Sequence, residues 1–105
     1  MVRYEVIWAK AAIEDLREIS LHIEKDSPAQ ARRVAERILA VEALLSAHPR
    51  IGRQLPEFDD PDLRDWIVFN YRVIYRIRTN TIRIAMVLHG ARDLSLYLKH
   101  TSRSM

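Results

Sequence analysis

The sequence predicts an α+β domain in which an antiparallel helix hairpin packs on one face of a mostly antiparallel four-stranded sheet, in the order β-α-α-β-β-β. Two observations support this prediction. Between residues 10 and 47, apolar residues recur every three or four positions, which is the period of amphipathic helices. In residues 2–8, and in three runs that begin at Leu63, apolar and polar residues alternate as they do in strands.

Length and composition limit the organisation of the chain. Its 105 residues are enough for one domain with one core and too few for two. We therefore expect a single domain over residues 1–100 and a short flexible tail over 101–105. The sequence has no long apolar run, no signal-peptide pattern at Met1 and no cysteine, so we expect a cytoplasmic protein without membrane contact.

The first two predicted elements are a strand and a helix. Within residues 2–8, every second residue from Val2 to Trp8 is apolar, so one face of this strand should be buried. From Lys10 the spacing changes to three and four, with charged residues on the opposite side. An amphipathic helix is therefore expected to begin there and to end near Asp26.

A second helix is expected to follow directly. Ser27 can accept hydrogen bonds from the first N–H groups, Pro28 suits the first helical position, and Gln30 completes a capping box. The helical spacing continues to Ala47, shortly before Pro49. Because the connection between the two helices is short, they should form an antiparallel hairpin.

Residues 49–62 contain three of the four prolines and also Gly52, so we expect a loop without regular structure. Loops of this length in small domains are often functional. Three strands are expected after it, over 63–69, 71–78 and 81–88, separated by short turns. Hairpin-linked antiparallel pairing is the simplest arrangement for them.

Positive charge is concentrated in the second half of the chain. From Leu63 onward there are eight Lys or Arg and two Asp or Glu, whereas up to His48 there are seven and eight. By alternation, the strand at 71–78 directs one set of side chains to the core and a row of arginines to the other face. Such a row can bind phosphates, pair with carboxylates of a partner chain, or keep the surface solvated.

Five short segments occur in a recognisable order and spacing. They are Ala12–Leu16, Pro49–Arg53, Leu63-Arg64, Tyr71–Arg76 and Val87–Asp93. Together they resemble the RelE/ParE toxin superfamily over about Met1 to Leu98. The resemblance implies that the chain is the toxin half of a bacterial two-component toxin-antitoxin module.

The members of this superfamily divide by activity. RelE-like members cleave messenger RNA in the ribosomal A site, whereas ParE-like members act on DNA gyrase and are not nucleases. On the RelE pattern, Arg72 matches the phosphate-binding arginine of the third strand and Arg92 the arginine after the last strand, and both could stabilise a pentacovalent phosphate. His89 could serve as a base, and Tyr97 lies one place from the position of the family's C-terminal tyrosine.

The remainder of the RelE pattern is missing, which favours a ParE-like toxin. The paired lysines of the second strand fall on Arg64 and Trp66, and neither residue transfers a proton at neutral pH. The segment from His89 to Arg92 looks typical of ParE-like members. We therefore expect a gyrase poison that is not an enzyme. The alternatives are a ribosome-dependent mRNA endonuclease and a degenerate member that only binds its antitoxin.

The resemblance also implies a partner, a ParD-like cognate antitoxin. Its flexible, acidic C-terminal region would fold as it binds the toxin, and its N-terminal part would bind operator DNA. Alternation leaves apolar residues among the arginines of the uncovered sheet face, namely Trp66, Val68, Ile74, Ala85 and Val87. We predict that the antitoxin covers this mixed surface and buries Arg72, Arg76 or Arg83 against its carboxylates.

The residues expected to contact the antitoxin or the target are Arg64, Trp66, Arg72, Arg76, Arg78, Arg83 and Arg92. No metal or cofactor is expected, because His22, His48 and His100 have no metal-ligand spacing. Simpler roles are open as well: His89 can be a hydrogen-bonding residue at a strand end, and Trp66 a core or rim aromatic.

Overall fold

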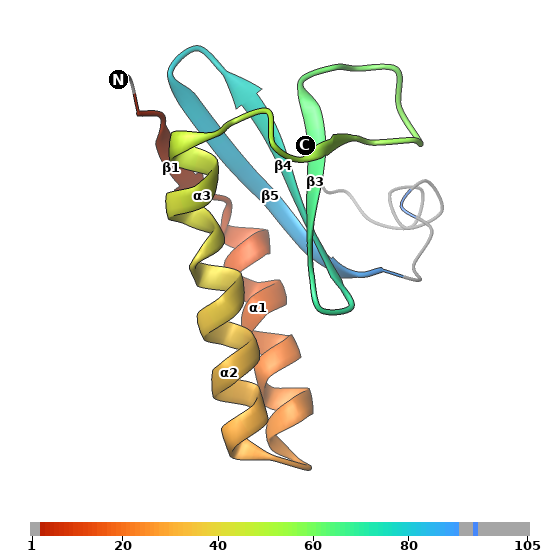
Figure 1. Ribbon diagram of the computed structural model, residues 1–105. Helices are drawn as coiled ribbons and strands as arrows, with labels where there is room; N and C mark the ends of the chain where they lie inside the picture. The colour runs from red at the N-terminus through yellow and green to blue at the C-terminus, as the bar shows by residue number, and fades with distance from the viewer. Residues whose placement is uncertain (1–2, 91–93, 95–105) are drawn as a thin grey trace.

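The computed structural model describes residues 3–90 and Leu94, and its elements follow the predicted order (Figure 1). The helices are α1 (Lys10–Glu24), α2 (Pro28–Leu39) and α3 (Val41–Ala47). The strands are β1 (Glu5–Trp8), β2 (Arg53–Gln54), β3 (Leu63–Val68), β4 (Tyr71–Arg78) and β5 (Thr81–His89). No helix among the described residues is long and apolar enough to cross a bilayer. The tail predicted at 101–105 lies outside the described residues.

The strands form one sheet in the order β1-β5-β4-β3-β2, in which β1 is parallel to β5 and the other neighbours are antiparallel. This is the predicted α+β fold, but within the described residues the sheet has five strands and not four. The additional strand, β2, lies within 49–62, where we expected a loop. Its residues Arg53 and Gln54 pair with Asp65 and Arg64 of β3. Proline and glycine content indicates a loop but carries no information about pairing with a distant strand.

The second helix begins where its capping signal predicts. The Ser27 hydroxyl oxygen accepts a hydrogen bond from the Gln30 backbone N–H at 3.1 Å, and Pro28 occupies the first turn. The helix differs from the prediction at Ala40, which separates α2 from α3. Ala40 keeps helical dihedral angles (φ −65°, ψ −16°), so α3 continues in the general direction of α2 (Figure 1).

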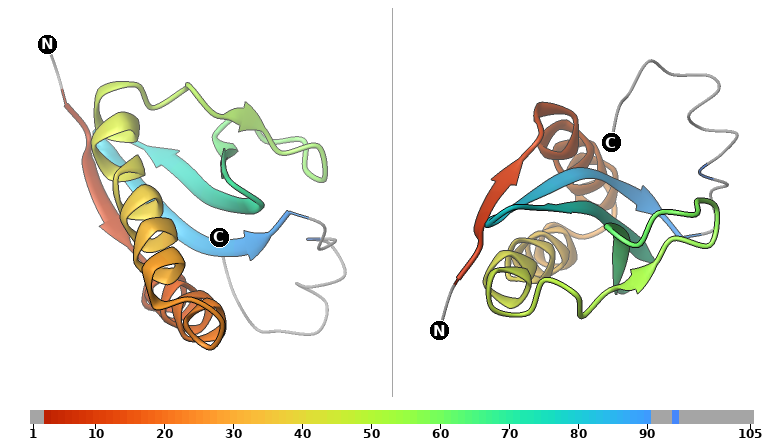
Figure 2. Two further views of the ribbon diagram at one scale, coloured as in Figure 1. Left: turned by 60° about the horizontal axis from the view of Figure 1, so that its bottom comes forward. Right: turned by 90° about the horizontal axis from the view of Figure 1, so that it is seen from above.

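The main hydrophobic core lies between the helices and one face of the sheet. The two long helices run side by side, and the sheet that they contact is strongly twisted (Figure 2). From Val73 onward, every second residue of β4 enters this core, and the predicted apolar face of β1 packs against it. Asp15 of α1 is buried here, and its carboxylate accepts a hydrogen bond from the Val87 backbone N–H at 3.0 Å. This bond ties α1 to β5.

Several residues expected on the uncovered face belong to the main core. A bulge in β5 leaves Ala85 without a partner on β4, which reverses the alternation beyond it. Val87 therefore faces the helices, while Ala85 belongs to a second cluster on the opposite face. Trp66 and Val68 also lie on the helix side, because the register of β3 places them opposite core-facing residues of β4. The expectation that Trp66, Val68 and Val87 lie on the uncovered face is wrong.

The opposite face of the sheet has a smaller core of its own. Ile74 lies there as predicted, but it is buried together with residues of β3 and β5. Leu55 and Phe58 from the segment between β2 and β3 cover this cluster, and Leu94 is also part of it. The face that we expected to be open is therefore partly closed by the chain itself.

Gly52 lies where the connection between α3 and β2 passes close to the core. Its backbone N–H donates a hydrogen bond to the Tyr75 hydroxyl oxygen at 3.0 Å, and that hydroxyl donates to the Pro49 carbonyl oxygen at 2.8 Å. The Tyr75 side chain is fully buried, and burial raises the pKa of its hydroxyl. The neutral hydroxyl thus fixes the path of the chain from α3 to β2.

Replacing Gly52 with alanine is expected to destabilise the fold by about 1–3 kcal/mol, the usual cost of overpacking. The new Cβ would meet the Asp65 carbonyl oxygen and lie 2.6 Å from the Tyr75 hydroxyl oxygen. Urea unfolding followed by tryptophan fluorescence measures the change in free energy. Tyr75→Phe is the matched control, because it removes the hydrogen bonds without adding an atom. A Gly52→Ala protein as stable as the wild type would contradict this close approach.

Candidate functional site

The arginines that alternation places in one row have different surroundings in the structure. Arg72 is buried, with 4% of its surface exposed, whereas Arg78 is exposed. Arg92 and Tyr97, two of the predicted site residues, lie outside the described residues. The described arginines are therefore not equally accessible to a ligand.

Asp65 of β3 is a fully buried carboxylate that binds two arginines. Its Oδ1 accepts a hydrogen bond from Arg53 Nε at 2.8 Å, and its Oδ2 accepts one from Arg72 Nε at 2.8 Å. An isolated buried carboxylate is very costly, so these two guanidinium groups are needed to compensate its charge. The carboxylate thereby ties both β2 and β4 to β3.

Glu57 binds the outer edge of the Arg72 guanidinium group. Arg72 Nη1 donates to Glu57 Oε2 at 2.8 Å and Arg72 Nη2 donates to Glu57 Oε1 at 3.0 Å, which makes the pair bidentate. The two side chains are 5% and 18% exposed. All three nitrogen atoms of Arg72 therefore bind carboxylates of this chain. We call Arg53, Glu57, Asp65 and Arg72 the Asp65 network.

The pKa shifts in the Asp65 network follow from these contacts. The hydrogen bonds from Arg72 lower the pKa of Glu57 below its ordinary value, although burial acts in the opposite direction. The same hydrogen bonds, with the one from Arg72 to Asp65, raise the pKa of Arg72. Glu57 and Arg72 are consequently both charged at neutral pH, and their attraction holds the segment between β2 and β3 against the sheet.

Two further arginines hold the same segment. Arg64 Nε donates to the Pro61 carbonyl oxygen and Arg64 Nη1 to the Gly52 carbonyl oxygen, both at 2.9 Å. Arg76 Nη1 lies 3.1 Å from Asp60 Oδ2 in a partly exposed ion pair. Arg64 and Arg76 therefore stabilise the chain's own loop, whatever else they contact.

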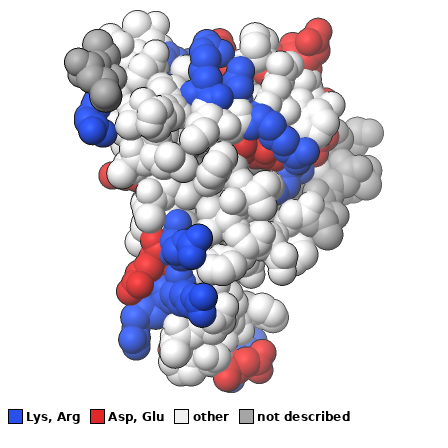
Figure 3. All heavy atoms as spheres, viewed as in Figure 1, with Lys and Arg blue, Asp and Glu red and all other residues white. Residues whose placement is uncertain are grey.

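The basic surface that stays accessible on the sheet is smaller than predicted. Arg83 lies opposite Arg76 in the β4–β5 ladder and is partly exposed, and the exposed Arg78 lies near the turn of the same hairpin. Figure 3 shows Lys and Arg side chains in separate groups over the sheet and over the helices, with acidic side chains beside them. Arg78 and Arg83 therefore form a patch at one end of the sheet, which we call the basic patch, and not a continuous row of arginines.

His89 does not lie beside Arg72. Its ring makes an edge contact with Tyr71, with ring centroids 5.8 Å apart and an interplanar angle of 82°. Tyr71 packs against the main core, so this pair is on the helix side of the sheet. Arg72, the next residue on β4, points to the opposite face. The structure therefore does not bring together the base and the phosphate-binding arginine that a RelE-like mechanism would use.

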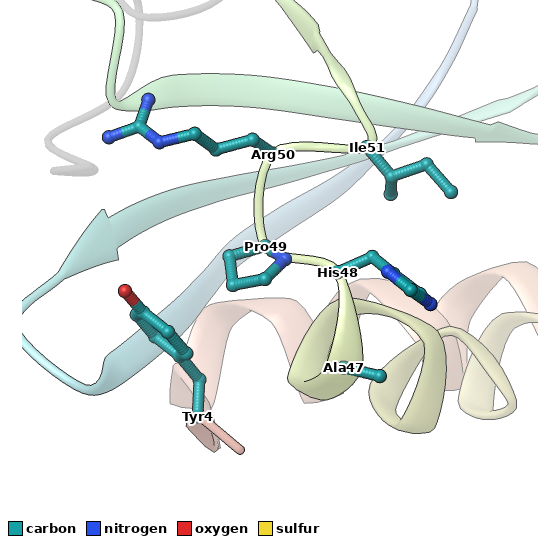
Figure 4. A pocket seen from close by; sticks show the side chains of 6 residues that line it. All are labelled: Tyr4, Ala47, His48, Pro49, Arg50 and Ile51. Atoms are coloured by element: carbon teal, nitrogen blue, oxygen red, sulfur yellow. The ribbon is translucent and has the colours of Figure 1, made fainter. Parts of the chain in front are cut away.

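A separate pocket lies away from these residues. It has a volume of about 560 Å³ and is formed by the end of α3, the connection after it and the residue before β1. Tyr4 and Arg50 lie on one side of Pro49, and His48 and Ile51 on the other (Figure 4). Among the described residues, its lining includes none of the predicted site residues. Within the described part of the chain, no three His, Cys, Asp or Glu side chains are grouped to hold a metal ion.

The sequence alone did not reveal the acidic partners of the arginines, Glu57, Asp60 and Asp65. A signal for two of them was present, because residues 49–62 contain four carboxylates and precede the arginine-rich strands. Opposite charges in a loop and in the strands beside it indicate internal pairing as readily as they indicate an external ligand. The burial of Asp65 leaves no such signal.

Replacing Glu57 with glutamine is expected to lower the free energy of unfolding at pH 7 by about 2 kcal/mol, the typical loss for a charged hydrogen-bonded group. Because the pKa of Glu57 is lowered in the fold, its contribution is complete above the ordinary value of 4.5 and disappears as the pH falls through the folded-state pKa. The difference between wild type and Glu57→Gln should therefore shrink below about pH 4.5.

Urea unfolding of both proteins between pH 3.5 and 7 measures this difference. Glu14→Gln is the control, since Glu14 is exposed on α1 and its replacement removes the same charge. A difference for Glu57→Gln that is constant across this range would show that the ion pair with Arg72 does not contribute to stability.

The sequence and the fold both match known toxins. A family model described as the ParE toxin of the type II toxin-antitoxin system parDE matches residues 6–94. The solved structure of the chromosomal ParDE toxin-antitoxin system from Pseudomonas aeruginosa is similar, with a TM-score of 0.69 and 18% sequence identity. That similarity covers 85% of this chain and 98% of the other. No curated protein matches in a sequence search.

Two further structures share the fold. The toxin-antitoxin complex RelBE2 from Mycobacterium tuberculosis has a TM-score of 0.63 and 26% identity, and the match covers 88% of this chain and 97% of that one. A double mutant of the Escherichia coli toxin RelE in the free state has a TM-score of 0.66 and 18% identity, covering 98% and 99% of the two chains. Because the family model spans the helices and the sheet, the chain belongs to the ParE toxin family of type II toxin-antitoxin systems.

Proposed function

We propose that this chain arrests bacterial growth by binding DNA gyrase and trapping it on cleaved DNA, without catalysing a reaction itself. The observation that carries the proposal is the state of Arg72. In a RelE-like nuclease this position would face the scissile phosphate. Here Glu57 and Asp65 occupy all three nitrogen atoms of its guanidinium group, and the side chain is 5% exposed.

The other positions of a RelE-like site support the same proposal. Trp66 replaces a lysine and packs on the helix side, so it offers no proton donor or acceptor to a substrate on the Arg72 face. His89 lies with Tyr71 on the helix side as well. A protein that acts by binding needs no such groups, because its effect depends on a complementary surface and not on proton transfer.

We also propose that a cognate antitoxin neutralises the toxin, and that contact with operator DNA occurs only through that antitoxin. The similar structures from Pseudomonas aeruginosa and Mycobacterium tuberculosis belong to toxin-antitoxin systems. Of the three arginines expected to meet antitoxin carboxylates, Arg72 already has carboxylate partners within the chain. Arg76 also has a carboxylate partner, Asp60, but Arg76 and Arg83 are both more exposed than Arg72.

The target can be identified with the purified protein. We expect it to increase double-strand DNA breaks in a gyrase cleavage assay and to leave mRNA on programmed ribosomes intact. A short pulse of expression in bacteria without the antitoxin should give the same result, with broken chromosomes and intact messages. Cut messages with intact chromosomes would instead establish the ribosome-dependent endonuclease, and neither effect would indicate a member that only binds its antitoxin.

The exposed basic patch should contribute to target or antitoxin binding. We expect the double replacement of Arg78 and Arg83 by alanine to weaken the affinity for gyrase or for the antitoxin by about tenfold at low salt. The effect should become smaller at higher salt, because salt screens the charges. The matched control replaces Arg17 and Arg32 by alanine. Both are exposed on the helices, and their replacement removes the same charge. Binding measured by titration calorimetry at two salt concentrations decides the matter, and equal effects of both pairs would show that only net charge counts.

A further inference from the structure

The outer edge of β3 is only partly paired. Because the Leu63 carbonyl oxygen accepts a hydrogen bond from the Leu55 N–H, and backbone direction alternates along a strand, Asp65 and Ile67 direct their backbone groups to this outer side. β2 pairs with β3 only opposite Arg64 and Asp65. No strand among the described residues lies opposite Ile67, so its backbone groups are available to an added strand.

Surface of mixed polarity continues from this edge toward the helices. A groove of about 330 Å³ lies between β3 and the junction of α2 and α3. Its lining includes Trp66, Val68 and Leu44. Ile67 and Phe69 border the same groove and are unusually exposed for apolar residues, at 49% and 42%. An extended segment paired with Ile67 would therefore direct alternate side chains into this groove.

The charge of the groove specifies the kind of segment that fits it. Arg37 is the charged residue in its lining, and its guanidinium carbon lies 5.2 Å from the centroid of the Phe69 ring. Arg33, one turn earlier on α2, is also exposed. A segment that combines apolar side chains with carboxylates would match both the apolar side chains in the lining and these two cations.

A second copy of this chain fits the edge poorly. Antiparallel pairing of two β3 edges about a two-fold axis would place both α2 helices on the same face of the joined sheet. The Arg37 side chains of the two copies would then approach one another without an acidic residue in the groove lining to compensate them. Like charges brought together in this way oppose association.

We propose that the edge of β3 at Ile67, with the groove beside it, is the docking site for an extended acidic segment of the antitoxin. The segment pairs with β3 as an additional strand, places an apolar side chain against Trp66, and directs carboxylates to Arg37 and Arg33. This inference rests on the proposed function, because it assumes that an antitoxin binds. It assigns antitoxin binding to the outer edge of β3. The strand β4 and the basic patch lie on the other side of β3.

Three variants test the proposal with the full-length toxin and its cognate antitoxin. Arg37→Glu reverses the charge of the groove and should weaken binding at least about tenfold. Arg32→Glu is the matched control on the same helix and should change affinity less than about twofold. Phe69→Asn removes the aromatic wall at a residue whose φ is 53°, a conformation that asparagine tolerates. It should weaken binding while leaving the melting temperature unchanged or higher.

Hydrogen exchange provides a second measurement that does not depend on substitution. The Ile67 amide should exchange quickly in the free toxin and slowly in the complex. If the antitoxin does not bind wild-type toxin, the proposed function fails together with this inference. If it binds, but Arg37→Glu and Phe69→Asn have full affinity and Ile67 exchange is unchanged, the docking site alone is wrong. Slow exchange of the Ile67 amide in the free protein would show that this chain or a second copy already pairs with the β3 edge. This result would also overturn the proposal.

Discussion

The burial of the Asp65 carboxylate is the constraint on which the sheet face away from the helices depends. A charge without solvent contact must be compensated, and the two arginines that compensate it come from different strands, β2 and β4. Once Arg72 is fixed there, its outer edge binds Glu57 and draws in the segment between β2 and β3. That segment brings Leu55 and Phe58 over the second apolar cluster, so charge pairing and apolar burial support one another.

This arrangement separates the arginines into two groups with different consequences for function. Arg53, Arg64 and Arg72 bind groups of the chain itself and maintain the loop. Arg78 and Arg83 remain at least partly accessible near the end of the β4–β5 hairpin. A basic composition therefore overstates the surface that can attract a nucleic acid or an acidic protein. We propose that partners bind at the basic patch and at the β3 edge, where backbone groups and apolar side chains are exposed together.

Local sequence signals predicted the elements well because each depends on neighbours in the chain. The capping residues before α2 and the alternation along β4 are both present in the structure. Predictions failed where an outcome depends on distant residues. The bulge at Ala85 and the register of β3 assign Val87 and Trp66 to the helix side, and strict alternation cannot anticipate either. For the candidate site, alternation placed Arg72 and Arg76 on the sheet face away from the main core, but it did not reveal their acidic partners.

The sequence by itself determined the α+β class, the order of the main elements and the family, since these follow from hydrophobic periodicity and from short motifs in a fixed order. Only the tertiary structure decided which arginines are accessible and which edge of the sheet is open. The physical reason is that a guanidinium group binds a carboxylate of its own chain or of a partner with the same chemistry. Which carboxylate it meets depends on strand register and loop path, and these are set by packing across the whole domain.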